Sequence, residues 1–218
     1  MQRSPAAFPK MHHRMRTQPN LPESIRRIVL TGFMGAGKST IGELLAQRLR
    51  WGFVDTDAVI ESRAGMTIAR IFAEQGEPAF RELEAEAIRY HAQAEEMVLA
   101  LGGGAIESEA AREALQSLPH VCVVFLDAPL DVMMARCLSQ PGAAERPVLR
   151  DRERLTARLA ARLPHYRRAH LTVSTVDLTP EAVANRILEA VEDSLPGRAP
   201  AFASPKENQR SKGTPKDR

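Results

Sequence analysis

The chain has 218 residues, of which 44% are hydrophobic and 26% are charged. These proportions are typical of folded soluble proteins and exclude a wholly disordered chain, and the sequence contains no apolar run of about 18 residues that could span a membrane. The net charge is +3, but only 5% of the residues are aromatic, so stacking side chains for nucleic acid are scarce. We therefore expect a cytoplasmic protein that binds an anionic small molecule, with no nucleic-acid or membrane partner.

The two ends of the chain differ in composition from its middle. Residues 1–24 contain four prolines, three of them before Leu21, several basic residues and no acidic residue before Glu23, without apolar periodicity. Residues 196–218 consist mainly of Pro, Gly, Ser, Lys and Arg and hold few large apolar residues. We expect both segments to be flexible tails around one globular domain over 25–195, which we expect to be a monomer.

Within this domain, short apolar segments alternate with amphipathic ones. Strands are predicted over 27–31, 52–54, 97–101, 121–126 and 171–174. Helices are predicted over 39–50, 107–117, 130–138, 150–168 and 180–193, and several helical stretches over 58–91. The alternation predicts a three-layer α/β fold, in which a five-stranded parallel sheet is flanked by helices.

The first strand is followed by Gly-Phe-Met-Gly-Ala-Gly-Lys-Ser at 32–39, which matches the phosphate-binding loop pattern GxxxxGK[ST]. Such a loop turns backbone N–H groups and a helix N-terminus toward phosphate oxygens, while Lys38 contacts the β- and γ-phosphates and the Ser39 hydroxyl binds Mg²⁺. We therefore predict a P-loop NTPase fold with ATP and Mg²⁺ as ligands. The predicted nucleotide-binding residues of the loop are Gly35, Ala36, Gly37, Lys38, Ser39 and Thr40.

Asp55 and Asp57 follow the second predicted strand, where a parallel sheet opens its binding crevice. If the strand continues through them, alternation places both carboxylates on one side. Asp55 could then hold Mg²⁺ through water. Asp57 could accept a hydrogen bond from an acceptor hydroxyl and orient or deprotonate it.

Six motifs occur in the order typical of shikimate kinases, spanning about 26–192. They are the phosphate loop, the two aspartates, Phe80-Arg81-Glu82-Leu83-Glu84 (FRxxE), Gly102-Gly103-Gly104, Arg146-Pro147-Val148-Leu149 of the lid, and Arg162 with Tyr166 (RxxxY). The chain therefore resembles the shikimate kinase family. The resemblance implies a fold like that of nucleoside-monophosphate kinases, with a lid over about 139–150.

The resemblance also implies a reaction, the transfer of the γ-phosphoryl group of MgATP to the 3-hydroxyl of shikimate in aromatic amino-acid biosynthesis. It assigns Arg81 and Arg162 to the substrate carboxylate, because a guanidinium fork matches two oxygens, and Glu84 to holding Arg81. The glycines would offer backbone contacts to the ring hydroxyls, and Asp57 would position the acceptor hydroxyl first and act as a base second. Lys38 and Arg146 would neutralise the charge on the transferred group, with Ser39 and Asp55 at the metal.

Two features depart from the family pattern. Residues 140–145 replace a short basic stretch, so Arg136, slightly too early, is the one candidate for stacking on adenine, and Leu101 replaces a common threonine. Two alternatives stay open. One is another small-molecule kinase, for gluconate or a nucleotide, and the other is a non-catalytic nucleotide-binding module with basic tails. Neither alternative explains Asp57, Arg81 and Arg162 together.

Overall fold

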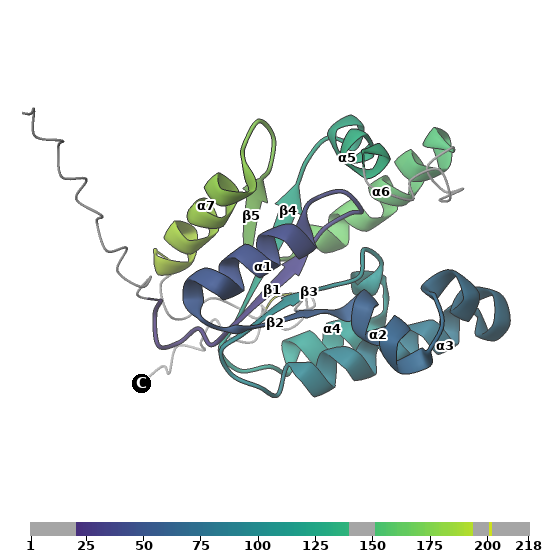
Figure 1. Cartoon of the computed structure of the whole chain (residues 1–218), viewed down its shortest axis with the longest axis horizontal. Coiled ribbons are helices and arrows are strands. Elements are labelled where there is room, and N and C mark those ends of the chain that lie inside the picture. Colours follow the sequence, from purple (N-terminus) through teal and green to yellow (C-terminus); the bar gives the residue numbers. More distant parts are fainter. Residues whose placement is uncertain (1–20, 140–150, 194–200, 202–218) are drawn as a thin grey trace, which may run out of the picture.

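The computed structural model describes residues 21–139, 151–193 and 201. Five parallel strands form one sheet in the order β2-β3-β1-β4-β5 (Figure 1). The strands are β1 (Arg27–Thr31), β2 (Gly52–Asp55), β3 (Met97–Ala100), β4 (Val121–Asp127) and β5 (Leu171–Ser174). This confirms the predicted five-stranded parallel sheet.

Helices flank the sheet on the segments that the sequence predicts. They are α1 (Lys38–Leu49), α2 (Thr56–Ala64), α3 (Ile68–His91), the 3₁₀ helix η1 (Ala105–Glu107), α4 (Glu109–Gln116), α5 (Leu130–Leu138), α6 (Arg152–Tyr166) and α7 (Pro180–Glu192). Helices α1 and α7 pack side by side, while α3 contacts both α2 and α4 (Figure 1). Within the described residues, no helix is both long and apolar enough to cross a membrane.

Strand β1 lies at the centre of the sheet and is buried along its whole length, which explains its apolar sequence. Its first residue, Arg27, is also buried, and its guanidinium donates to the carbonyl oxygens of Ala92, Gln93 and Pro119 at 2.5, 3.1 and 2.9 Å. These bonds satisfy the buried charge with backbone dipoles. Arg27 thus ties two loops together at the end of the sheet where β1 begins.

The carboxyl ends of β1, β2 and β3 meet at one edge of the sheet because the strands are parallel. Ala100 is in register with Leu30 on one side and with Asp55 on the other. Three loop segments therefore leave the sheet side by side: the phosphate loop after β1, the two aspartates after β2 and the glycine turn after β3. A crevice at this edge is where α/β sheets bind ligands.

Two local structures differ from the expectations. Strand β2 ends at Asp55, which is the N-cap of α2, so Asp57 lies in the first helical turn and strand alternation does not place it. The expected helix from 107 begins instead as η1, and α4 starts at Glu109 after Ser108 caps it by accepting from Ala111 N. In both cases an Asp or Ser side chain accepts a helix-end N–H, which favours a new helix start.

The helical stretches predicted over 58–91 are two helices. Helix α2 ends at Ala64 with Gly65 as its C-cap, and α3 contains a non-helical residue, Gly76, two residues before Pro78. Proline is well tolerated in the first turn of a helix, so the second part of α3 starts here. Arg81 and Glu84 consequently lie near the beginning of that second part.

Candidate active site

The phosphate loop forms one wall of a cavity of about 560 Å³ at the carboxyl edge of the sheet. The N-cap of α1 is Gly37, and no side chain caps the helix, so its first N–H groups are open to an anion. Residues 35–40, all predicted to bind the nucleotide, line this cavity, together with Asp57, Gly103, Arg136, Thr175, Leu178, Pro180 and Val183.

Lys38 is folded back onto its own loop. Its Nζ donates to the carbonyl oxygens of Gly32 at 2.9 Å and Phe33 at 3.1 Å. Burial lowers the pKa of Lys38, while the nearby carboxylates of Asp57 and Asp55 oppose this shift. A bound phosphate would supply the negative charge that favours the ammonium form.

Arg136 lines the same cavity, where its guanidinium is held between the segment that follows β5 and the carbonyl oxygen of Gly35, which accepts at 3.5 Å. It donates to the Thr175 hydroxyl at 2.8 Å and to the Thr175 carbonyl at 2.7 Å. These bonds fix its plane against the cavity wall. Arg136 is therefore available to contact the base of a nucleotide, and this assignment stays a prediction.

Ser39 and Asp55, the two predicted metal ligands, lie together. The Ser39 hydroxyl donates to Asp55 Oδ2 at 2.5 Å, and Asp55 Oδ1 accepts from the N–H groups of Asp57 and Ala58. A hydroxyl and a carboxylate are hard oxygen donors, and Mg²⁺ usually takes one or two protein ligands and keeps waters and phosphate oxygens. The pair fits Mg²⁺, and among the described residues no cluster of three His, Cys, Asp or Glu side chains competes for a metal.

We expect Asp55→Asn to raise the Mg²⁺ concentration needed for half-maximal activity by about tenfold or more. Asparagine also caps helices well, so α2 should be kept while the charge at the metal position is lost. A Mg²⁺ titration at fixed ATP measures this, with the thermal midpoint as control. An unchanged Mg²⁺ requirement would contradict the assignment of Asp55 to the metal.

A second cavity, of about 370 Å³, adjoins the first one. It is lined by Arg81, Glu84, the three glycines at 102–104, Arg158 and Arg162, with Ile68, Phe72, Glu77 and Phe80 on the α3 side. Met34, Asp57 and Gly103 line both cavities. Asp57 is thus placed at the junction of the two, between the phosphate loop and the arginines.

Arg81 and Arg162, far apart in the sequence, lie close to one glycine turn. A Cβ atom built on Gly104 would be 2.7 and 2.8 Å from the Nη2 and Nη1 atoms of Arg81 and 3.0 Å from Nη2 of Arg162. The Arg162 guanidinium also lies over the ring of Phe33, 5.6 Å from its centroid. Two forked cations therefore converge on one side of the second cavity, as the carboxylate clamp requires.

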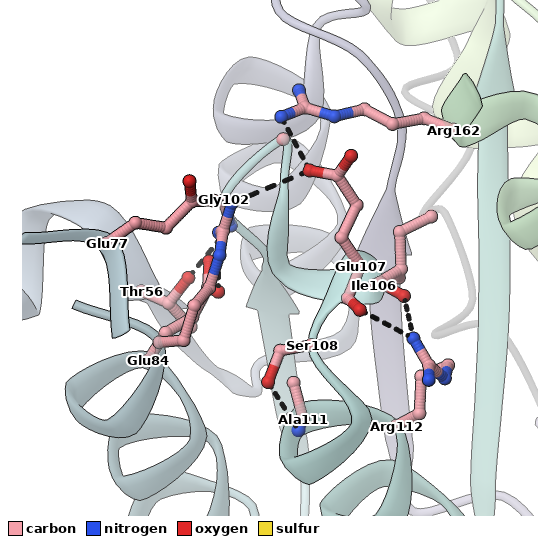
Figure 2. A network of polar contacts seen from close by, with 12 residues as sticks. Thr56, Glu77, Glu84, Gly102, Ile106, Glu107, Ser108, Ala111, Arg112 and Arg162 are labelled. Atoms are coloured by element: carbon pink, nitrogen blue, oxygen red, sulfur yellow. Dashed lines mark hydrogen bonds and ion pairs between the residues drawn. The ribbon is translucent and has the colours of Figure 1, made fainter. Parts of the chain in front are cut away.

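Carboxylates surround the Arg81 guanidinium. Its Nη1 is 3.0 Å from Glu84 Oε2, and its Nη2 is 2.8 Å from Glu77 Oε1 and 3.5 Å from Glu107 Oε2. The predicted contact between Glu84 and Arg81 is therefore present in the structure. Of these three acids, Glu107 is the one that pairs with Arg162, and its Oε2 is 2.7 Å from Arg162 Nη2 (Figure 2).

Glu84 and Asp57 are both carboxyl groups in poorly solvated places. Burial raises the pKa of Glu84 to about 7, more than its ion pair with Arg81 lowers it. Burial, and next the charge of Asp55, raise the pKa of Asp57 to about 6, against the opposing charge of Lys38. A carboxylate whose pKa approaches neutrality can accept a proton from a bound hydroxyl more readily than an ordinary one.

Two buried side chains hold the glycine turn in place. The Thr56 hydroxyl accepts from Gly102 N at 3.0 Å, and the Tyr166 hydroxyl donates to the Gly103 carbonyl at 2.5 Å. Tyr166 in turn stacks on Phe125, with ring centroids 5.0 Å apart. Helix α6 therefore carries both Arg162 and, one turn later, the residue that fixes the turn beside it.

We expect Gly104→Ala to raise the KM for the acceptor by about tenfold or more while the KM for ATP stays nearly unchanged. The added methyl would meet both guanidinium groups at 3.0 Å or less, so the arginines must move, and a shift of about 1 Å at a binding group can cost up to a hundredfold. The KM for ATP of the same variant is the control, because Gly104 lines the second cavity and not the first. Equal increases in the two KM values would argue against a crowding effect on the arginines.

Sequence reasoning missed three members of this site: Thr56, Glu107 and Phe33. Thr56 lies between the two aspartates, and Phe33 is a variable position of the phosphate loop, so neither carries a pattern. Glu107 follows the glycine turn by three residues, and this spacing was the one available signal. Arg146 lies outside the described residues, as do the other residues of 140–150, so the role of Arg146 stays a prediction.

Known proteins resemble this chain over most of its length. A family model described as shikimate kinase matches residues 34–192. The shikimate kinase of Geobacter sulfurreducens is 42% identical over 177 residues, covering 80% of this chain and 95% of that protein, and that of Salinibacter ruber is 39% identical over 184 residues, covering 79% and 88%. This chain belongs to the shikimate kinase family.

Solved shikimate kinases share the fold. The Acinetobacter baumannii enzyme, in complex with shikimate, superposes with a TM-score of 0.70 at 35% identity, covering 78% of this chain and 94% of that one. The Aquifex aeolicus enzyme gives 0.64 at 33% identity, covering 76% and 96%. A sugar kinase from Janibacter, at 20% identity and a TM-score of 0.51, shows the same fold alone. Membership in the shikimate kinase family accords with the six motifs and their order.

Proposed function

We propose that this protein transfers the γ-phosphoryl group of MgATP to the 3-hydroxyl of shikimate, giving shikimate 3-phosphate and ADP. The observation that carries the proposal is the junction of the two cavities at Asp57. One cavity is built for phosphates by residues 35–40, and the other has two arginines for a carboxylate. A substrate anchored by its carboxylate would present a ring hydroxyl to Asp57, facing the nucleotide.

The arginine cavity is polar and incompletely satisfied. Among the described residues, Arg162 Nε and Glu84 Oε1 are buried without a hydrogen-bond partner. Buried polar groups of this kind are costly unless they gain partners. A bound ring with one carboxylate and several hydroxyls offers both acceptors and donors to this cavity. A gluconate or nucleotide acceptor explains the convergence of Arg81 and Arg162 less well.

In the proposed reaction, a bond forms between the shikimate hydroxyl oxygen and the γ-phosphorus while the bond from that phosphorus to the ADP oxygen breaks. Asp57 accepts the hydrogen bond of the hydroxyl, keeps its oxygen in line with the γ-phosphate and takes its proton as the new bond forms. Lys38 stabilises the charge on the transferred group. Such transfers pass through a loose transition state, so alignment and charge matter more than a strong base.

Ser39 and Asp55 would hold the Mg²⁺ ion of MgATP, which neutralises phosphate charge when bound. Arg146 keeps its predicted part in neutralising the transferred group. We also infer that residues 25–195 form the catalytic unit and that it works as a cytoplasmic monomer, where MgATP is available. Support for this unit is that the described residues that line the two cavities all lie between Met34 and Val183.

The test is an acceptor panel. ADP release from MgATP should depend on shikimate and should be much slower with quinate, gluconate or nucleoside monophosphates at the same concentration. A preference for gluconate or a nucleotide would show that the protein is another small-molecule kinase. ATP binding without stimulation by any acceptor would support the non-catalytic module instead.

We expect kcat/KM for shikimate to rise with pH through about 6 and to level off above it. Asp57 acts as an acceptor only when ionised, and its pKa in the free protein, which kcat/KM reports, is raised to about 6. Initial rates at subsaturating shikimate and saturating MgATP, between about pH 5 and 8, measure this. A profile that is flat across this interval would contradict the assignment of Asp57.

A further inference from the structure

Glu107 is the last residue of η1, and hydrogen bonds hold its backbone in place. Its N–H donates to the Gly104 carbonyl at 3.0 Å. The guanidinium of Arg112 donates to the carbonyl oxygens of Ile106 and Glu107, both at 2.8 Å (Figure 2). With its backbone held on α4 in this way, the Glu107 side chain reaches toward the arginines of the second cavity.

The Glu107 carboxylate lies between Arg81 and Arg162. Its Oε2 is 2.7 Å from Nη2 of Arg162 and 3.5 Å from Nη2 of Arg81. In Figure 2 the Glu107 side chain points up toward Arg162, while Arg112 lies below and contacts the Glu107 backbone. One carboxylate oxygen of the protein itself therefore contacts both guanidinium groups that the proposed function assigns to the carboxylate of the substrate.

Of the acids around the arginines, Glu107 is suited to leave. Glu84 is fully buried and Glu77 contacts Arg81 alone, whereas the Glu107 side chain is 36% exposed beside arginines that are only 15% and 11% exposed. A partly exposed ion pair contributes little to stability, so its carboxylate can turn into water at small cost. The arginines would meanwhile stay on their buried supports.

The negative charge around the two arginines also favours displacement of Glu107 by a substrate carboxylate. Glu77, Glu84 and Glu107 already face the two guanidinium groups. A substrate carboxylate would add a further negative charge at the position where Glu107 lies, and like charges in contact repel. Binding therefore favours exchange of one carboxylate for the other over the presence of both.

We propose that Glu107 is an internal competitor for the substrate carboxylate: it occupies the arginine clamp in the free enzyme and is displaced when substrate binds. It thereby weakens substrate affinity and sets the KM for the substrate. This inference rests on the proposed function.

Glu107→Gln tests the inference, because glutamine keeps the size and an acceptor oxygen but removes the charge. We expect the KM for shikimate to fall by about two- to fivefold, the change that removal of one partly exposed ion pair allows. The kcat and the KM for ATP should stay within about twofold of those of the unmodified protein. Glu109→Gln, which removes an exposed charge from the first turn of α4, is the matched control and should leave the KM for shikimate unchanged.

A second measurement separates competition from simple support of the arginines. Titration of shikimate into the nucleotide-free protein should give a lower Kd for Glu107→Gln, even if its thermal midpoint falls because ion pairs are lost. A supporting role would instead raise the Kd and the KM. If the unmodified protein phosphorylates shikimate but Glu107→Gln has an unchanged or raised KM, the inference is wrong and the proposed function stands. If the unmodified protein does not phosphorylate shikimate, the proposed function is wrong and the inference with it.

Discussion

Asp57→Asn is expected to lower kcat for shikimate phosphorylation by about a thousandfold, within the range typical of a positioned general base. Asparagine has the same shape, but its amide cannot take the hydroxyl proton, and it removes the negative charge that faces Lys38. The loss should appear in kcat, because Asp57 acts on the hydroxyl in the transition state rather than in anchoring the carboxylate. Steady-state rates with both substrates near saturation measure this.

Two controls accompany this variant. ATP binding measured by titration should be kept, since residues 35–40 are untouched, and the rise of kcat/KM near pH 6 should disappear. Asp131→Asn, which removes an exposed carboxylate paired with Arg152 on the surface, should leave kcat within about twofold. A loss of less than about tenfold in Asp57→Asn would mean that Asp57 does not deprotonate the acceptor, since the asparagine amide oxygen can still accept its hydrogen bond.

Arg162→Lys is expected to raise the KM for shikimate by about a hundredfold and to leave the KM for ATP nearly unchanged. Lysine keeps the positive charge but loses the planar fork, which can bind two carboxylate oxygens at once and can stack on the ring of Phe33. Initial rates over a wide range of shikimate concentrations at saturating MgATP measure the effect.

Arg154→Lys is the matched control for this experiment, because Arg154 is an exposed arginine of the same helix. It should behave like the unmodified protein. An unchanged KM for shikimate in Arg162→Lys would show that Arg162 does not bind the carboxylate. A rise in the KM for ATP of the same size would place Arg162 at the nucleotide instead.

The fold could be predicted from the sequence because its strands are short, apolar and separated by amphipathic helices. The strands at 27–31 and 171–174 have the predicted bounds, and the phosphate loop lies between its strand and helix as its pattern requires. The motif residues Asp57, Arg81, Gly104 and Arg162, spread over more than a hundred positions, line one cavity. For Asp57 and Gly104 that convergence follows from a parallel sheet, whose carboxyl ends meet at one edge, while Arg81 and Arg162 reach the cavity from helices α3 and α6.

Other parts of the site depend on contacts that no local pattern reports. Alternation would have oriented Asp57 only if the strand continued through it, but Asp55 caps α2 with one carboxylate oxygen, and the helix begins a residue later. Thr56 matters because its buried hydroxyl meets a glycine turn 46 positions away. Glu107 reads as an ordinary helix-start acid, and only the fold brings it to Arg162.

The central claim is that the clamp and Asp57 together select one hydroxyl of shikimate for phosphorylation. ³¹P NMR of the product formed from MgATP and shikimate tests it most directly, because coupling to a ring proton identifies the oxygen that carries the phosphate. The account predicts one phosphate ester, on the 3-hydroxyl, formed in step with ADP. Phosphate on another hydroxyl, a mixture of esters, or inorganic phosphate released without any ester would contradict it.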